Sequence, residues 1–245
     1  LICRELKTEE IEAIVKAFGQ AALIAKSSGF DGIEIHAVHE GYLLDCFTMT
    51  LFNKRTDKYG GDLRGRLRFA CEIVQEIKKT CGADFPVVLR FSIKSYIKAL
   101  RQGAVPGESF QELGRDIGEA REAIPILEEA GYDAFDCDAG TYDSWYWAHP
   151  PMYFGKGMYL SLVKEVRDCF TKPVLVAGRM DNIQMAVDAV NSHLIDGVGL
   201  GRPLLSDPDY CNKVRSGTPN RFVLAWAATT DASAVCSNPV WAAAP

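Results

Sequence analysis

The sequence has no excess of basic residues, no long apolar run and no leader-like N-terminus, and each absence narrows its function. Its 27 Lys and Arg residues are outnumbered by 32 Asp and Glu residues, for a formal net charge of −5. Nucleic acids and anionic membranes favour a basic surface, so neither is expected as a partner. No apolar run reaches the ~18 residues that span a bilayer, and the N-terminus lacks the layout of a signal peptide. We therefore expect a cytoplasmic protein that acts on small molecules.

Paired cysteines are also missing. The chain has eight cysteines, scattered singly and without any C-x-x-C spacing: Cys3, Cys46, Cys71, Cys81, Cys137, Cys169, Cys211 and Cys236. A disulfide framework or a zinc site would show regular close spacings, so reduced and mostly buried thiols are the better interpretation. His36 and His39 lie on an extended segment that offers no obvious third or fourth ligand. We therefore expect no metal site.

Apolar runs alternate with amphipathic segments along most of the 245 residues. Predicted strands cover residues 31–36, 86–92, 134–138, 173–177 and 196–200. Predicted helices cover a segment capped by Thr8 and ended by Gly29, then 67–77, 117–130, 159–170, 183–191 and a short stretch beginning near Asp207. Such alternation indicates a parallel sheet covered by helices in one domain. An open doubly wound sheet and a (β/α)8 TIM-type barrel both fit this pattern.

Polar residues at the ends of the strands favour the barrel. They are His36, Arg90, Asp138, Gly178 with Arg179, and Gly201 with Arg202. Barrel enzymes place their chemistry at the carboxyl ends of many strands, whereas an open sheet concentrates its ligand contacts at one switch point. A barrel of this class has eight strands, and only about five βα units can be counted here. The sequence therefore predicts an α/β fold of the barrel type that is incomplete.

The last two predicted strands end in patterns that suit a phosphate group. Gly178 and Arg179 follow one strand, and Gly201 and Arg202 follow the next. Glycine lets the backbone approach an anion closely, and arginine adds a charge and a fork of donors. Tight turns with exposed arginines are the alternative interpretation.

Arg90, His36, His39 and Tyr42 are the remaining candidates. Arg90 lies inside the apolar run PVVLRFS, where an unpaired charge is costly, so it should face an anionic or electron-rich partner; a structural salt bridge is the alternative. Neutral imidazoles at His36 and His39 suit hydrogen bonds to a carbonyl, unless backbone groups satisfy them. The Tyr42 phenol can serve as a general acid in a desolvated pocket, or simply pack its ring. These residues alone do not identify a reaction.

Residues 29–69, GFDGIEIHAVHEGYLLDCFTMTLFNKRTDKYGGDLRGRLRF, closely resemble the signature of the NADH:flavin oxidoreductase family related to Old Yellow Enzyme. N-x-R-x-D-x-Y-G-G at residues 53–61 is the most diagnostic part. The later pieces LRFS, DAGTYDSW, LVAGRMD and GLGRPLLSDPD follow the family in order as far as about Gly217. The branch that the chain resembles contains 2-enoate reductases, 2,4-dienoyl-CoA reductases and bile-acid-modifying flavoproteins.

The resemblance implies an FMN-dependent oxidoreductase that uses NADH or NADPH to reduce, or in reverse to form, a C=C bond conjugated to a carbonyl. It implies that hydride passes from flavin N5 to the alkene, that Tyr42 supplies the proton, and that His36 or His39 polarises the carbonyl. His149, in the loop after the strand DCDAG, is similar to an active-site histidine of the dienoyl-CoA reductase branch.

The same resemblance implies how FMN is held. Arg90 is similar to the arginine beside flavin N1 and O2, where a cation stabilises the anionic reduced ring. The FMN phosphate is then held by Gly178, Arg179, Gly201 and Arg202.

The chain departs from the family at both ends. Relatives carry roughly three further strands upstream, so the sheet should have unpaired edges that threaten stability and FMN affinity. Relatives in this branch also have a cysteine cluster downstream for a 4Fe-4S centre. Cys236 is the only thiol in the corresponding segment, so no 4Fe-4S cluster is expected. We predict a partial FMN-binding barrel domain over residues 1–217 and an atypical tail over 218–245.

Two other functions stay open. One is a truncated, catalytically silent barrel fragment that binds FMN weakly or only with a partner chain. The other is a flavin-free phosphate-binding lyase or isomerase. The substrate is expected to be a small enone, enoate or enoyl-CoA. The aromatic loop at residues 142–154 could face a steroid, an acyl-CoA or a cinnamate, and the sequence does not favour one of them. The sequence also leaves open whether the protein is a homo-oligomer.

Overall fold

Five parallel strands form the centre of the fold. The computed structural model describes residues 4–37 and 43–217. The strands run in the order β1 (Ile33–His36), β2 (Val87–Ser92), β5 (Ala134–Asp138), β6 (Val174–Val176) and β7 (Gly197–Val198). Each neighbouring pair is parallel, and among the described strands β1 and β7 form the two edges. The predicted α/β class with a partial barrel is confirmed.

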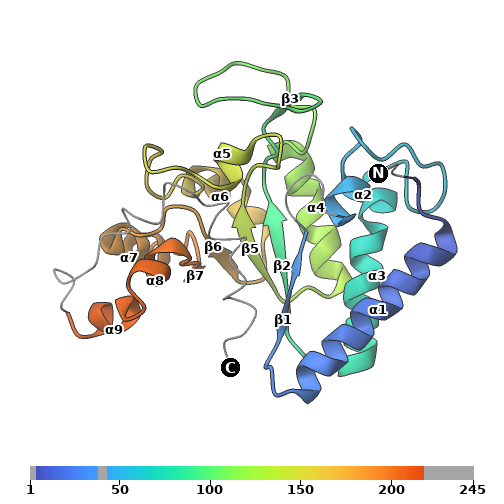
Figure 1. Ribbon diagram of the computed structural model, residues 1–245, viewed down its shortest axis with the longest axis horizontal. Helices are drawn as coiled ribbons and strands as arrows, with labels where there is room; N and C mark the ends of the chain where they lie inside the picture. Colours follow the sequence, from blue (N-terminus) through green and yellow to red (C-terminus); the bar gives the residue numbers. More distant parts are fainter. Residues whose placement is uncertain (1–3, 38–42, 218–245) are drawn as a thin grey trace.

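Helices connect the strands. They are α1 (Thr8–Ser27), α2 (Leu43–Thr48), α3 (Leu63–Cys81), α4 (Ile117–Ala130), α5 (Trp145–Ala148), α6 (Leu160–Val166), α7 (Ile183–Asn191), α8 (Arg202–Ser206) and α9 (Tyr210–Arg215). Figure 1 shows α1, α3 and α4 side by side along β1 and β2, with α7, α8 and α9 at the other end of the sheet. Within the described ranges, no helix is long and apolar enough to cross a membrane.

The two faces of the sheet differ in chemistry. One row of neighbouring residues, buried in the core with the helices, contains Ile35, Leu89, Phe135 and Val174. Successive side chains on a strand point to opposite faces, so the next row points away from these helices. That row contains His36, Arg90 and Asp136 in register. The sheet therefore presents its polar side chains together on one face.

Short polar side chains begin three of the helices. Asp62, Asp116 and Asn182 cap α3, α4 and α7, and each accepts a hydrogen bond from the backbone N–H three residues later, at 2.8, 2.8 and 3.1 Å. Such caps satisfy backbone donors that have no partner within the helix. They explain why α4 and α7 begin at the residues that the sequence predicts.

The first helix begins differently from the prediction. Thr8 is the first helical residue, and Lys7 occupies the cap position. The Glu10 carboxylate accepts a hydrogen bond from the Lys7 backbone N–H at 2.8 Å, so an acidic side chain in the first turn satisfies this end. The prediction that Thr8 caps the helix was therefore wrong by one position.

Several short elements were also missed by the sequence patterns. The segment interpreted as a loop up to about Asp62 contains α2, and α8 precedes the short helix predicted near Asp207, which begins at Tyr210. The helix predicted over 159–170 ends as a 3-10 turn at Arg167–Cys169. A hairpin of β3 (Ile97–Ala99) and β4 (Gln102–Gly103) follows β2. Elements this short carry too few residues to show a period.

A buried charged cluster fixes α2 against the sheet. The Arg115 side chain is 3% exposed, and its guanidinium donates to the Thr48 hydroxyl at 2.7 Å and to the Ser92 carbonyl at 3.0 Å. The carboxylate of Asp45, 1% exposed, lies 3.5 Å from the same guanidinium. Breaking such a pair leaves a buried charge without compensation.

Replacing Arg115 should therefore destabilise the protein strongly. We expect Arg115→Leu to lower the free energy of unfolding by about 3–5 kcal/mol, measured by urea denaturation. Arg121→Leu is the matched control, because the Arg121–Asp168 pair is exposed, with side chains 40% and 68% accessible. That control should lose no more than about 1 kcal/mol. Equal losses in the two variants would contradict a special role for the buried cluster.

Candidate active site

An ion pair lies at the carboxyl ends of β2 and β5. Nε of Arg90 donates to Oδ2 of Asp138 at 2.8 Å, and Nη2 of Arg90 lies 2.7 Å from the same oxygen. The Asp138 side chain is almost fully buried, whereas Arg90 is partly exposed. The sequence left an anionic partner of Arg90 and a structural salt bridge as alternatives. The structure shows that Asp138 is its ionic partner.

Burial and charge act on this pair in opposite directions. Burial raises the pKa of Asp138 to about 7, although the nearby Arg90 charge favours the ionised carboxylate. Burial also raises the pKa of Asp136, the register neighbour of Arg90, again against the effect of the arginine. Arg90 stays charged, and the net charge of the Arg90–Asp138 pair depends on pH near neutrality because Asp138 titrates there.

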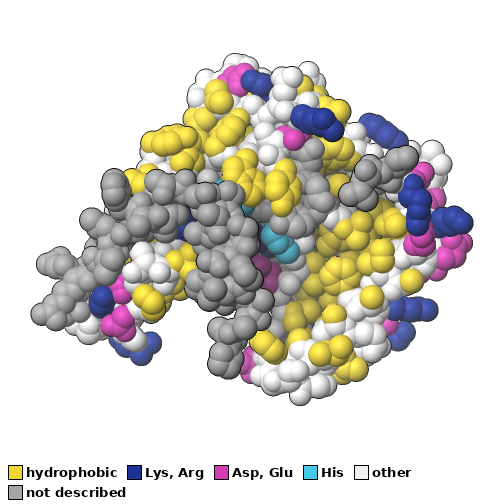
Figure 2. Space-filling view, in the orientation of Figure 1, with side chains coloured by type: hydrophobic (Ala, Val, Ile, Leu, Met, Phe, Trp, Pro, Cys, Tyr) yellow, Lys and Arg dark blue, Asp and Glu magenta, His cyan; other side chains and the backbone are white. Residues whose placement is uncertain are grey.

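Two histidines flank Arg90. His36 is its neighbour on β1, and His149 comes from the loop after β5. The pKa of each imidazole is lowered to about 4, first by desolvation and then by the positive charge of Arg90. Both rings are therefore neutral at pH 7 and suit hydrogen bonding to a neutral oxygen. Figure 2 shows histidine atoms at the centre of this face, beside a broad apolar surface.

Tyr42 and His39 lie outside the described residues. Their roles stay predictions, as do the whole tail at 218–245 and the interpretation of Cys236. The structure nevertheless fixes both sides of the Tyr42 segment, since β1 ends at His36 and α2 begins at Leu43. Any side chain between them is therefore attached within six residues of His36 in sequence.

The two Gly-Arg pairs turn out to differ. Gly178 has a φ of +98°, and an added Cβ would come within 2.2 Å of the Tyr159 ring, so only glycine fits there. Arg179, at φ +56°, donates to the backbone carbonyls of Pro151 at 3.1 Å and Phe154 at 2.8 Å. Its guanidinium thus holds the aromatic loop, a contact that the sequence did not predict.

Arg202 keeps its donors available. It begins α8 directly after Gly201, where an added Cβ would meet nothing within 4 Å. Its guanidinium makes no hydrogen bond or ion pair with the described part of the chain, and its pKa is lowered by burial and then by the positive charge of Arg179. A half-buried cation beside a second cation is stabilised by an anion. This position therefore fits the phosphate of a bound ligand.

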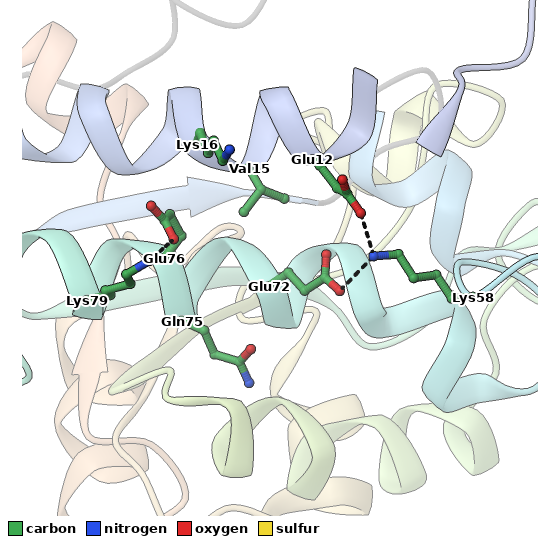
Figure 3. A pocket seen from close by; sticks show the side chains of 8 residues that line it. All are labelled: Glu12, Val15, Lys16, Lys58, Glu72, Gln75, Glu76 and Lys79. Carbon is green, nitrogen blue, oxygen red and sulfur yellow. Dashed lines mark hydrogen bonds and ion pairs between the residues drawn. The ribbon is translucent and has the colours of Figure 1, made fainter. Parts of the chain in front are cut away.

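A groove on the other side of the molecule is unrelated to this site. It has a volume of about 350 Å³ and is lined by α1, α3 and Lys58 from the loop before α3 (Figure 3). Nζ of Lys58 lies 2.8 Å from Glu12 and 3.8 Å from Glu72, so the lining charges largely satisfy each other. Among the described residues, no group of three or more His, Cys, Asp or Glu side chains is placed to hold a metal ion.

The fold and the site define a class of protein: an enzyme with a partial parallel α/β barrel, whose strand ends carry neutral imidazoles, an arginine paired with Asp138, and Arg202, which is unpaired within the described residues. The chain belongs to the NADH:flavin oxidoreductase / NADH oxidase family, whose sequence profile it matches over residues 1–221. The resemblance seen in the sequence is thereby confirmed, as is FMN as the cofactor that this family uses.

Individual relatives agree with this family. The chain is 58% identical to a cinnamate reductase of Clostridium sporogenes over 212 residues, which is 86% of this chain and 32% of that protein. A 2-naphthoyl-CoA reductase in complex with 2-naphthoyl-CoA superposes with a TM-score of 0.78 at 31% identity, covering 90% of this chain and 31% of that one. Morphinone reductase in complex with tetrahydroNAD gives a TM-score of 0.64 at 27% identity, covering 88% and 51%. The chain thus spans about a third of the first two relatives.

Proposed function

We propose that this chain forms the FMN-binding part of a reductase that uses NADH or NADPH to saturate a C=C bond conjugated to a carbonyl. When bound, FMN supplies the hydride chemistry that links the nicotinamide to the alkene. The observation that carries the proposal is the cluster at the strand ends, where neutral His36 and His149 flank the charged Arg90. Neutral hydrogen-bonding groups beside a fixed cation suit a conjugated carbonyl next to an anionic ring.

Each residue has a distinct role in this proposal. Arg202 holds the FMN phosphate together with the backbone of Gly178 and Gly201, and the Gly201 turn leaves space for it. Arg90 faces the flavin pyrimidine ring. His36, or the adjacent His39, donates a hydrogen bond to the substrate carbonyl, which withdraws electrons from the β-carbon.

Two more groups complete the site. His149, which acts electrostatically on His36, gives the carbonyl a second neutral partner. Tyr42 supplies the proton to the α-carbon as a general acid.

The substrate proposed is an arylacrylate such as cinnamate. The 58% identity to a cinnamate reductase supports it, and so does the 2-naphthoyl-CoA complex of a structural relative. In the loop after β5, Trp145 stacks on His149 and Tyr142 stacks on Trp145, and aryl groups stack well on such rings. NADH and NADPH are both compatible with these residues.

Flavin binding and alkene reduction test the proposal together. The purified chain is incubated with FMN and desalted, and its spectrum should keep the flavin bands near ~370 and ~450 nm. Anaerobic NADH oxidation should then depend on cinnamate and yield its saturated product, whereas the already saturated dihydrocinnamate should give no turnover. A protein that never retains FMN would favour the silent fragment instead.

Substitutions in the Arg90–Asp138 pair should shift the midpoint potential of the bound flavin in opposite directions. We expect Arg90→Ala to lower the midpoint potential of the bound flavin, because a cation that stabilises the anionic reduced ring is lost. Asp138→Asn should raise the potential at pH 8, because it removes the charge that offsets Arg90. At pH 5, below the Asp138 pKa of about 7, the same variant should differ little from the wild type. Shifts of the same sign in both variants would remove the pair from the flavin site.

A further inference from the structure

Trp145 lies face to face with the imidazole of His149. The two ring centroids are 3.9 Å apart, and the ring planes differ by only 17°. The His149 backbone N–H also donates to the Trp145 carbonyl at 2.7 Å. Tyr142 stacks on Trp145 in turn, at 5.2 Å and 13°. The three rings form a near-parallel series that ends at His149.

The loop that carries these rings is anchored at other points. The buried Ser144 hydroxyl donates to the Ser95 carbonyl at 2.7 Å. The Trp147 indole N–H donates to the Ala104 carbonyl at 2.7 Å, and its ring stacks on Tyr96 at 3.8 Å. None of these anchors involves the Trp145 side chain, which has no hydrogen-bond partner among the residues that the structure describes. Its ring, 38% exposed, contacts His149 rather than filling the core.

This arrangement restricts the orientation of the His149 ring. The last torsion of a histidine side chain is broad, so an imidazole needs a neighbour to fix its plane. The indole covers one face of the His149 imidazole. Three charged or titratable groups act on His149: Arg90 on β2, Arg202 on α8 and His36 on β1. The two arginines disfavour a positive charge on His149, and His36 is itself neutral at pH 7.

We propose that Trp145 is a positioning residue, which fixes the plane of the His149 imidazole and keeps it dry, so that His149 meets the substrate carbonyl as a neutral hydrogen-bond partner. The role at the carbonyl rests on the proposed function, whereas the effect on His149 itself does not. Trp145 acts only through His149 and need not touch the reacting atoms.

The test measures His149 directly and the reaction separately. In the FMN-loaded chain with labelled histidines, NMR titration gives the His149 pKa, with the resonance assigned by its loss in His149→Gln. We expect Trp145→Leu to raise this pKa by about one unit or more towards the ordinary value near ~6.5, because water reaches the ring. Trp145→Phe should keep it within about half a unit, since a flat ring is retained. Cinnamate turnover should fall ~10-fold or more in kcat for Trp145→Leu, with KM changed less, and recover in Trp145→Phe.

Tyr153→Leu is the control, because Tyr153 is an 84% exposed aromatic residue of the same loop. It should change neither measurement. An unchanged or lowered His149 pKa in Trp145→Leu would overturn the inference, and so would an equal loss in Tyr153→Leu. Should Trp145→Leu fail to fold, Trp145→Phe still decides, because a pKa moved by a unit in that variant contradicts ring positioning. A raised pKa in Trp145→Leu with no cinnamate turnover in the wild type would refute the proposed substrate and still support the positioning of His149.

Discussion

Replacing Tyr42 by phenylalanine should cut alkene reduction by ~10²-fold or more, because a positioned general acid contributes about that much. NADH oxidation with an artificial acceptor such as ferricyanide should change little, since that reaction needs no proton at an α-carbon. The loss should therefore appear in turnover with cinnamate alone, measured by product formation under anaerobic conditions. Substitution by phenylalanine keeps the ring, so packing and flavin affinity should stay close to those of the wild type.

The structure gives this prediction a physical setting. Tyr42 lies between the end of β1 and the start of α2, and α2 is held by the buried Asp45–Arg115 pair. The described elements on either side of Tyr42 are thus held within the fold, and a general acid has to reach one carbon reproducibly. Tyr153→Phe serves as the control, because it removes a hydroxyl from an exposed ring of the aromatic loop. Equal loss in both NADH-dependent reactions would show that Tyr42 supports nicotinamide or flavin binding instead.

The fold could be predicted where periodicity and caps agreed. The helix at Ile117–Ala130, the strand at Ala134–Asp138 and the helix at Ile183–Asn191 begin and end at the predicted residues. In each of the two helices a capping carboxylate or amide marks the first turn. The β3–β4 hairpin escaped prediction because distant groups hold it: the Glu112 carboxylate accepts the backbone N–H groups of Tyr96 and Ile97 at 2.8 and 2.9 Å. No local pattern encodes such a contact.

The sequence predicted where the site residues lie better than it predicted which groups they contact. Parallel strands bring their carboxyl ends to one edge, so His36 and Arg90 could be placed together from the sequence. The partner of Arg90 could have been found in the same way, because Asp138 ends the neighbouring strand. The contacts of Arg179 could not, because they depend on a left-handed backbone and on a loop some 25 residues away. Arg179 and Arg202, which look equivalent in the sequence, therefore have different surroundings in the structure.

From this difference between Arg179 and Arg202, we expect Arg202→Ala to lower the affinity for FMN through loss of a contact to its phosphate. FMN binding should weaken by ~30-fold or more, about 2 kcal/mol, because a partly buried charge-assisted contact is removed. Riboflavin has the same ring without the phosphate, so its affinity should change by less than ~3-fold, as both titrations by fluorescence quenching would show. Arg215→Ala is the control, since Arg215 is an exposed cation at the end of α9 with no bond to the site. Equal losses for the two ligands would mean that Arg202 supports the local fold, and an unchanged FMN affinity would place the phosphate elsewhere.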